Sequence, residues 1–562
     1  MKTGERSLNG PQTSGRTYRN LSQPSYEIDD SLRNQRVPVH GGVELLADVY
    51  LPRGGPRAPA IFSASPYPRQ IQNSGAPLGF VEAGATDFFV SRGYVHVIAN
   101  VRGTGGSGGT YDLFGPDERT DMGELVEWIA AQPWCDGSVG GVGVSAFAMT
   151  QLEAALEATP HLKAIFAPLN SLDVYELYYH GGVMNTTFDI AWVRSVAKLA
   201  NLNDATLRSA AVGLVEAVLR NPRLHAKFAH FNGEAALGAL KLTMRGTLHP
   251  PFSTLAMACS VEHQVKDDFW QARNMTTGLR NIRVPVYLGS DWQNVPVHLP
   301  STFTIYNGLP PNVPKRMSLL AEYGFTWPWE SLHVEALAWF DHWLRGRDTG
   351  IMDGPPIRYV ILGEPGGPWH EASAWPPPEC SMLTWRLRTD ETLAEDHGVD
   401  GTRAYTYVSP ALAPLIETDE TMLSWSTPPL ESEVRLVGPV ELLLDASSTG
   451  GDVAFLVTLQ DVAPDGTATD VTMGWRRAAI SDDYTKLGDV PAGVMRRYTI
   501  RLVDNARCFA PGHRVRLLVR SDDTTGPAPM MGFHHAQIGV SSRISIASSS
   551  RLKMSVVPTR SS

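Results

Sequence analysis

Short runs of apolar and β-branched residues, broken by glycine and proline, predict β-strands after about residue 36. These runs are VPVH (37–40), VELLADVYL (43–51), PAIFSAS (59–65) and the nearly continuous apolar segment YVHVIANV (94–101). Two segments have apolar residues at helical spacing: DMGELVEWIAAQ (121–132) and, directly after the strand-like VGGVGV (139–144), AFAMTQLEAALEA (146–158). Strands that alternate with helices in this order are typical of an α/β domain with a parallel sheet.

The strand pattern stops between about residues 172 and 277, where AWVRSVAKLANL (191–202) and AAVGLVEAVLR (210–220) predict helices. It returns at VPVYLGS (284–290) and RMSLLAEY (316–323), and LHVEALAWFDHWLRG (332–346) predicts a closing amphipathic helix. We therefore predict an α/β core made of residues 26–171 and 278–352, with a helical cap over residues 172–277 inserted into it.

The two ends of the chain follow other patterns. Residues 1–25 are polar and rich in serine, glycine, asparagine and arginine, which predicts a flexible arm. From 353 to 562 the chain consists mostly of short alternating strands and turns, such as VELLLDAS (440–447) and RVRLLVRS (514–521). Many strands without intervening helices predict a β-sandwich or jelly roll.

Composition narrows the class of protein. A length of 562 residues with 43% hydrophobic residues predicts several folded domains. The net charge of −10, without a long basic run, argues against a nucleic-acid partner. No segment approaches the roughly 20 apolar residues that cross a bilayer, and the polar start lacks a signal-peptide core. We expect a cytoplasmic enzyme or binding protein with no membrane partner.

The strongest chemical motif is Gly143-Val144-Ser145, between a predicted buried strand and a predicted helix. A serine on such a strand-to-helix turn has its hydroxyl over the sheet edge, and the N–H of the next residue, Ala146, points at a developing oxyanion. The usual motif is G-x-S-x-G, and here Phe147 and Ala148 replace the second glycine. An ordinary helix N-cap serine is the alternative interpretation.

Serine hydrolases on such a sheet order their triad as serine, acid and histidine along the chain. The acid is expected after VPVYLGS, where Asp291 and Asn294 stand. The histidine is expected after RMSLLAEY, but the segment EYGFT (322–326) contains none.

The glycine-rich segment RGTGGSGG (102–109) could bind a dinucleotide phosphate only if a helix began directly after it. No helix pattern follows this segment, so we predict a structural turn there and no cofactor.

A series of motifs resembles the cocaine esterase and X-Pro dipeptidyl peptidase (CocE/NonD) family of serine hydrolases over nearly the whole chain after about residue 35. The motifs are GGVELLADVYLP (41–52), SPYP (65–68), EWIAAQPWCDGSVGGVGVS (127–145), DDFW (267–270), WFDHWLRG (339–346) and FAPGHRVRLLV (509–519). The resemblance implies an α/β-hydrolase core with an inserted helical cap and a C-terminal jelly roll.

The resemblance also implies roles for individual residues. Ser145 matches the family's nucleophile, and the Ala146 N–H and the Tyr67 hydroxyl match its oxyanion donors. The family's acid is the aspartate of a Trp-x-Asp motif. In this chain an amide, Asn294, occupies the position of that aspartate. The family's histidine position is occupied by Gly324. The resemblance thus implies an incomplete catalytic triad.

Several residues are candidates for the missing roles. His298, His180 and His333 are candidate substitute bases, and Asp291 is a candidate acid, with packing and turn capping as the alternatives. For the substrate pocket we predict His180, Trp292, His298 and Tyr179. Aromatic residues of the predicted cap favour an apolar or aromatic small molecule, with packing in the core of the cap as the alternative.

Three functions remain open from the sequence. The first is hydrolysis of, or acyl transfer from, an ester or amide through Ser145. The second is a lyase, isomerase or cyclase that reuses the pocket, because Gly324 and Asn294 replace the histidine and the acid. The third is a non-catalytic binding protein.

Two further expectations concern metals and partners. His534 and His535 are adjacent but no other metal-ligand pattern accompanies them, so we predict no metal site. We also expect that the chain can form a homodimer through the jelly roll.

Overall fold

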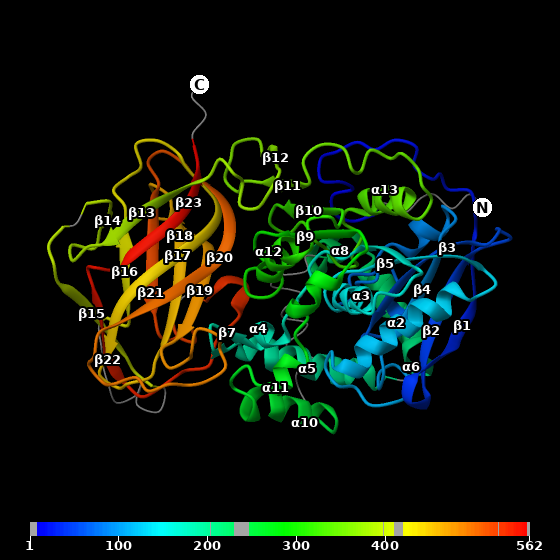
Figure 1. Cartoon of the computed structure of the whole chain (residues 1–562), viewed down its shortest axis with the longest axis horizontal. Helices are drawn as coiled ribbons and strands as arrows, with labels where there is room; N and C mark the ends of the chain where they lie inside the picture. Colours follow the sequence, from blue (N-terminus) through cyan, green and yellow to red (C-terminus); the bar gives the residue numbers. More distant parts are fainter. Residues whose placement is uncertain are drawn as a thin grey trace.

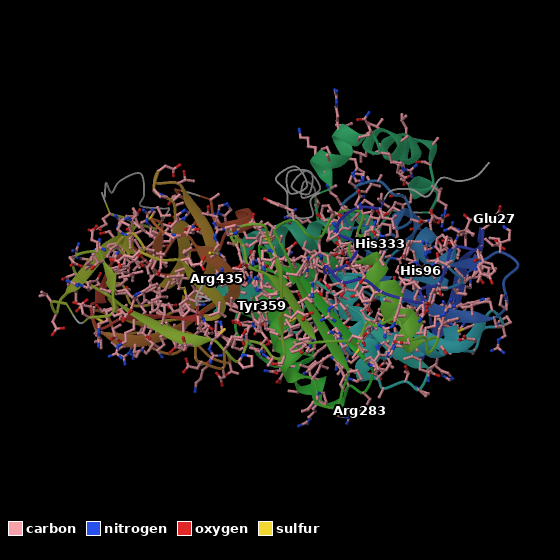
Figure 2. All side chains as sticks on the ribbon, turned by 90° about the horizontal axis from the view of Figure 1, so that it is seen from above. Glu27, His96, Arg283, His333, Tyr359 and Arg435 are labelled. Carbon is pink, nitrogen blue, oxygen red and sulfur yellow. The ribbon has the colours of Figure 1, made fainter. Side chains whose placement is uncertain are left out.

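The computed structural model describes residues 8–202, 204–229, 247–396, 398–409, 420–526 and 528–558. Figure 1 shows an α/β core, blue to green, at one end of the molecule and a C-terminal β domain, yellow to red, at the other. Helices between residues 172 and 277 lie beside the core, and Figure 2 shows some of them projecting from it. No helix in the described part of the chain is long and apolar enough to cross a membrane.

The core is built on a ten-stranded mixed sheet with the order β1-β2-β4-β3-β5-β6-β9-β10-β11-β12 among the described strands. Its strands are β1 (Ile28–Val39), β2 (Val43–Pro52), β3 (Ala58–Ser65), β4 (Val95–Asn100), β5 (Cys135–Val142), β6 (Leu162–Phe166), β9 (Val286–Asp291), β10 (Lys315–Leu320), β11 (Ile357–Val360) and β12 (Trp369–Ala372). Strands β4 to β11 pair in parallel and the outer pairs are antiparallel.

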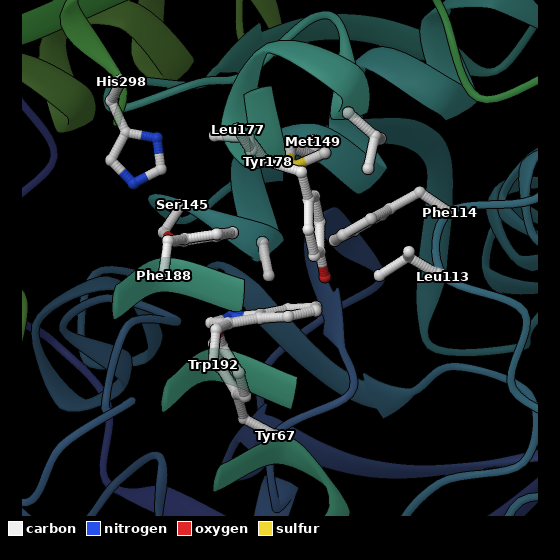
Figure 3. A pocket seen from close by; sticks show the side chains of 12 residues that line it. Tyr67, Leu113, Phe114, Ser145, Met149, Leu177, Tyr178, Phe188, Trp192 and His298 are labelled. Atoms are coloured by element: carbon white, nitrogen blue, oxygen red, sulfur yellow. The ribbon is translucent and has the colours of Figure 1, made fainter. Parts of the chain in front are cut away.

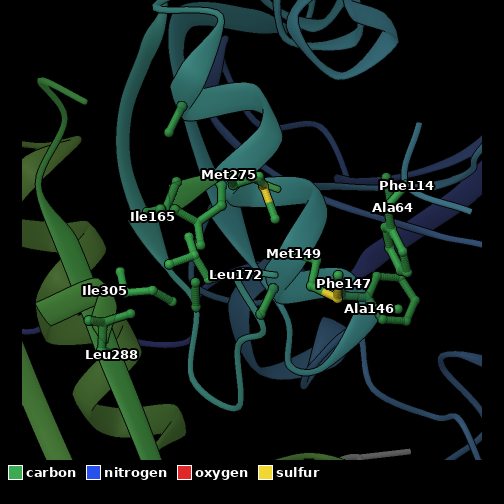
Figure 4. Packing of buried hydrophobic residues seen from close by; sticks show 14 of the residues in the cluster. Ala64, Phe114, Ala146, Phe147, Met149, Ile165, Leu172, Met275, Leu288 and Ile305 are labelled. Atoms are coloured by element: carbon green, nitrogen blue, oxygen red, sulfur yellow. The ribbon is translucent and has the colours of Figure 1, made fainter. Parts of the chain in front are cut away.

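Helices cover both faces of this sheet, as the apolar runs of its strands require. They are α1 (Thr86–Val90), α2 (Pro116–Ala130), α3 (Ala146–Leu156), α12 (Leu299–Gly308) and α13 (His333–Trp343). Apolar residues of α2, α3 and α12 belong to one buried cluster, part of which Figure 4 shows, and those of α13 belong to another. Helix α1 contributes Val90 to the first cluster and Phe89 to the second. The predicted α/β core is therefore confirmed.

The cap consists of α4 (Val174–Tyr178), β7 (Tyr179–His180), β8 (Val183–Met184), α5 (Thr186–Ala200), α6 (Asp204–Leu207), α7 (Ala210–Leu219), α8 (Pro222–Phe228), α10 (Phe252–Met257) and α11 (Asp268–Gln271). The small hairpin of β7 and β8 was not predicted from the sequence. It turns at Gly181 and Gly182, which have φ values of 55° and 82°. A Cβ atom on Gly181 would lie 2.0 Å from the backbone oxygen of Trp475, so glycine is needed where the hairpin packs on the C-terminal domain.

The C-terminal domain is an antiparallel β structure, as predicted. Its strands are β13 (Ser381–Leu387), β14 (Leu393–Ala394), β15 (Thr402–Tyr407), β16 (Met422–Ser426), β17 (Val434–Ser448), β18 (Ala454–Val462), β19 (Ala468–Arg477), β20 (Arg496–Phe509), β21 (Arg514–Arg520), β22 (Ser542–Ala547) and β23 (Arg551–Val557). Strands β11 and β12 lie beyond the predicted boundary at residue 353, yet they extend the core sheet.

The N-terminal arm differs from the prediction of a flexible segment. The backbone N–H and the hydroxyl of Ser14 donate to Glu335 at 2.5 and 2.8 Å, and those of Ser22 donate to Asp341 at 2.6 and 2.5 Å. Both acceptors are buried carboxylates of α13, which need hydrogen-bond donors. The polar arm supplies them, so residues 8–25 are attached to the core; residues 1–7 lie outside the described residues.

Candidate active site

Ser145 lies on a strained turn between strand β5 and helix α3. Its φ and ψ are 59° and −124°, a region that non-glycine residues rarely adopt. A Cβ atom on Gly143 would lie 2.4 Å from Cβ of Phe147, so the turn requires glycine at this position. The Ser145 side chain makes no capping hydrogen bond to α3, which argues against the N-cap interpretation. The geometry is that of a nucleophile elbow.

Two potential oxyanion donors flank this serine. Ala146 is the first residue of α3, and none of the described residues accepts a hydrogen bond from its N–H. The Tyr67 hydroxyl accepts a hydrogen bond from Trp192 Nε1 at 2.8 Å and also interacts with the Ser145 hydroxyl. Burial and the nearby Glu82 carboxyl raise the pKa of Tyr67 well above its usual value. Tyr67 therefore stays protonated and can donate its proton to a substrate.

Ser145 lines a cavity between the core and the cap (Figure 3). The cavity is lined by Tyr67, Leu113, Phe114, Ser145, Ala146, Met149, Val174, Leu177, Tyr178, Phe188, Trp192 and His298. No aspartate, glutamate, lysine or arginine is among these residues. The cavity is therefore an apolar and aromatic site with few polar groups, the usual character of a small-molecule site.

Asp291 and Asn294, at the end of β9, form a buried pair. Asn294 Nδ2 donates to Asp291 Oδ1 at 2.8 Å, and both residues are fully buried. The backbone N–H of Phe325, in the loop after β10, also bonds to the Asp291 carboxyl. Burial raises the pKa of Asp291 to about 7. Neither residue lines the cavity with Ser145, so the pair ties two core loops together.

Asp291→Asn is expected to change how stability depends on pH. The carboxyl has a pKa of about 7 in the folded protein and about 3.9 when unfolded, so the folded chain retains a proton that the unfolded chain releases. Its contribution to stability is present below about pH 4 and is lost as the pH rises to about 7, by up to about 4 kcal/mol. The thermal midpoint of Asp291→Asn should therefore rise relative to wild type between pH 4.5 and 8. An equal midpoint difference at both pH values, as expected for the exposed control Asp136→Asn, would contradict this.

The loop after β10 contains no histidine at the position where the resemblance places it. A Cβ atom on Gly324 would lie 2.5 Å from Cβ of Leu320, and the Gly324 carbonyl accepts a hydrogen bond from Ser331 Oγ at 2.8 Å. This backbone leaves no room for a side chain at residue 324. Within the described ranges, no histidine is hydrogen-bonded to Ser145.

His298 is the one predicted histidine that lines the cavity among the described residues. In Figure 3 its ring lies at the same end of the cavity as Ser145. Its Nδ1 lies 3.0 Å from Ser171 Oγ, and a hydrogen bond also joins the ring to the backbone of Asn170. Burial lowers the pKa of His298 to about 3, so the ring stays neutral.

The other predicted pocket residues are buried elsewhere. His180 Nδ1 lies 2.8 Å from Nε2 of His535, and its ring packs on Trp475 of the C-terminal domain. The Tyr179 hydroxyl donates to the carbonyl of Cys259 at 2.8 Å. Trp292 Nε1 donates to the carbonyl of Val360 at 2.7 Å. His180 thus joins the cap to the C-terminal domain, and none of these three residues lines the cavity.

Two further candidates also lie away from Ser145. His333 Nδ1 bonds to the carbonyl of Glu330 at 2.8 Å, its ring packs on Phe88, and Figure 2 places it in the core. The glycine-rich loop is the structural turn that we predicted, because a Cβ atom on Gly103 would lie 2.1 Å from the backbone nitrogen of Tyr111.

Sequence reasoning missed Glu82, whose carboxyl group interacts with the Ser145 hydroxyl. Glu82 lies in the loop between β3 and α1 and is 1% exposed. Trp327 Nε1, from the loop after β10, donates to Glu82 Oε1 at 3.4 Å. No motif marks either residue, and their contact depends on two loops that are about 240 residues apart in the chain.

A strained serine after a parallel strand and a cap over an apolar cavity are typical of an enzyme of the α/β-hydrolase type. The chain belongs to the X-Pro dipeptidyl-peptidase (S15) family, whose profile matches residues 41–330. Residues 349–532 match the X-Pro dipeptidyl-peptidase C-terminal non-catalytic domain.

Known proteins agree with this assignment. The chain is 25% identical to the cocaine esterase of Rhodococcus sp. (strain MB1 Bresler) over 87% of its own length and 90% of that protein. A CocE/NonD family hydrolase from Staphylococcus aureus has a TM-score of 0.71 at 19% identity, with 94% of each chain covered. An α-amino-acid ester hydrolase has a TM-score of 0.69 at 18% identity, with 98% of this chain and 100% of that chain covered. These structures share the fold of this chain.

Proposed function

We propose that this protein hydrolyses, or transfers the acyl group of, an ester or amide through nucleophilic attack by Ser145. The observation that carries the proposal is the strained backbone of Ser145 at the wall of an apolar cavity, next to the Ala146 N–H and the Tyr67 hydroxyl. These two donors would hold the oxyanion that forms when Ser145 Oγ attacks a carbonyl carbon.

The lining of the cavity favours a neutral, apolar or aromatic acyl group. Phe114, Phe188 and Trp192 form a stack of rings, with centroid distances of 6.0 Å and 5.9 Å between neighbours. A charged substituent would find no opposite charge among the lining residues and would lose its hydration. An aromatic ring, by contrast, gains both apolar burial and stacking.

A fluorophosphonate probe tests whether Ser145 is a nucleophile. We expect the wild-type protein to form one covalent adduct, seen by intact mass, and Ser145→Ala to form none. Ser138 lies within strand β5 (Cys135–Val142), seven residues before Ser145, so Ser138→Ala is a matched control that should label like wild type. Absence of an adduct on the wild-type protein would contradict the proposal.

A non-hydrolytic reaction in the same cavity is the second candidate. It is favoured by one observation: the Ala146 N–H and the Tyr67 hydroxyl lie beside Ser145, although no described histidine is hydrogen-bonded to Ser145. Such an enzyme would stabilise an enolate or alkoxide of its substrate without forming an acyl-enzyme.

A further inference from the structure

Glu82 is fixed directly beside the nucleophile by its backbone. Its carbonyl accepts a hydrogen bond from the N–H of Val144, the residue before Ser145, at 3.2 Å. Its own N–H donates to Gln72 Oε1 at 2.9 Å. Both bonds are buried, so the side chain starts from a defined position next to the elbow.

The Glu82 carboxyl has an environment that a structural acid normally avoids. It is buried, and the groups around it are the hydroxyls of Ser145 and Tyr67 and the indole of Trp327, all of them neutral. Oε2 completes no hydrogen bond of normal geometry within the described part of the chain, and no described cation pairs with the carboxyl. A buried carboxyl without a cation is costly, and such groups concentrate at functional sites.

Burial has opposite effects on Glu82 and on His298 as bases. When a neutral histidine accepts the serine proton, it creates a new pair of charges in an apolar cavity, and burial lowers the pKa of His298 to about 3. When a carboxylate accepts the same proton, the total charge of the site does not change. Burial raises the pKa of Glu82 well above its usual value, which makes its carboxylate a stronger base.

We propose that Glu82 is the general base for Ser145, in place of the absent triad histidine; this rests on the proposed function of Ser145 as nucleophile. The Glu82 carboxylate removes the proton of Ser145 Oγ as Oγ forms a bond to the carbonyl carbon of the substrate. The carbonyl π electrons move to oxygen, where the Ala146 N–H and the Tyr67 hydroxyl bind it.

The second half of the reaction uses the same carboxyl group. Protonated Glu82 gives its proton to the leaving alcohol or amine as the bond to the carbonyl carbon breaks. A water molecule then enters, and Glu82 removes its proton as its oxygen attacks the acyl-serine. Collapse of this intermediate releases the acid and returns the proton from Glu82 to Ser145 Oγ. One water is consumed for each ester or amide cleaved, and Glu82 ends the cycle as the carboxylate that it was at the start.

The proposal is tested with the rate at which a fluorophosphonate probe labels Ser145, measured from pH 4 to 10. For the wild type, the labelling rate should rise with pH, and this rising limb should lie well above the pH range in which a glutamate usually ionises, because only ionised Glu82 accepts the proton and burial raises its pKa. Glu82→Gln should lower the rate by about 10²–10³ at the plateau and remove this limb. Glu82→Asp keeps a carboxyl group and should retain a limb at a shifted pH.

Two controls separate catalysis from structure. Glu153, on the nucleophile helix α3, is also fully buried with a raised pKa, and Glu153→Gln should label within about threefold of wild type. His298→Gln should keep the pH dependence of the wild type.

Two outcomes would overturn the assignment of Glu82 while Ser145 remains the nucleophile. In the first, the wild type is labelled and Glu82→Gln is labelled at the same rate with the same pH dependence. In the second, only His298→Gln loses the pH dependence. If wild type does not label, both proposals fail. If Glu82→Gln does not fold, an unchanged limb in Glu82→Asp overturns the assignment.

Discussion

Replacing Ser145 with alanine is expected to lower kcat for an apolar p-nitrophenyl ester by about 10⁴–10⁶. The acyl-enzyme cannot form without Oγ, and removing the nucleophile of a serine hydrolase costs about as much as removing the whole triad. KM should change little, because the apolar lining of the cavity, and not the hydroxyl, holds the acyl group. Steady-state kinetics of purified wild type, Ser145→Ala and the Ser138→Ala control measure this effect.

The size of the remaining activity is informative. Ala146 and Tyr67 stay in place in the Ser145→Ala variant and should still give a rate of about 10³ over water. A loss of less than tenfold would show that the reaction does not pass through an acyl-serine. That result would favour the non-hydrolytic candidate, in which the cavity and its oxyanion donors do the chemistry.

Tyr67→Phe is expected to lower kcat by about 10²–10³ for the same ester. This is the usual cost of removing one oxyanion donor, and the loss should fall on kcat because the oxyanion exists only in the transition state and intermediates. The phenylalanine ring keeps the packing against Phe80 and Phe147, at centroid distances of 4.5 and 6.0 Å, so the fold should be retained.

Trp192→Phe is the matched variant for this effect. It keeps an aromatic ring in the cavity but removes the indole N–H that donates to the Tyr67 hydroxyl at 2.8 Å. The tyrosine then keeps its proton but loses its fixed orientation, so we expect a smaller loss than for Tyr67→Phe. A larger loss for Tyr67→Phe than for Ser145→Ala would argue against the acyl-enzyme and for a reaction that needs the oxyanion donors alone.

The elements and the elbow could be predicted from the sequence because their signals are local. Helix α3 begins at Ala146 and strand β9 ends at Asp291, each within about two residues of the predicted position. The polar arm was predicted wrongly and the β7–β8 hairpin was not predicted, because their structure depends on distant partners. These are Glu335 and Asp341 of α13 for the arm and Trp475 of the C-terminal domain for the hairpin. Helix and strand propensities describe single residues, so they do not include the effect of partners that are distant in the sequence.

The candidate active site also combines features that the sequence predicts with features that only the structure shows. His180 and His298 are both reasonable substitute bases in the sequence, yet one packs against the C-terminal domain and the other lines the cavity. The sequence alone does not show which of the two histidines lines the cavity, because that depends on how the cap packs on the core. The sequence did show that glycine, residue 324, stands at the position where the family has its histidine. The backbone at Gly324 leaves no room for a side chain.

The sequence by itself determined that this chain has a capped α/β core, a serine on a strand-to-helix turn and no histidine where its family would place one. These features follow from residue types at short spacing, which act through backbone geometry. Only the tertiary structure decided what surrounds the serine: Glu82 beside its hydroxyl, Trp327 beside Glu82, and Trp192 on Tyr67. The physical reason is that burial sets the basicity of each group, and burial depends on segments that are brought together only when the core and cap pack.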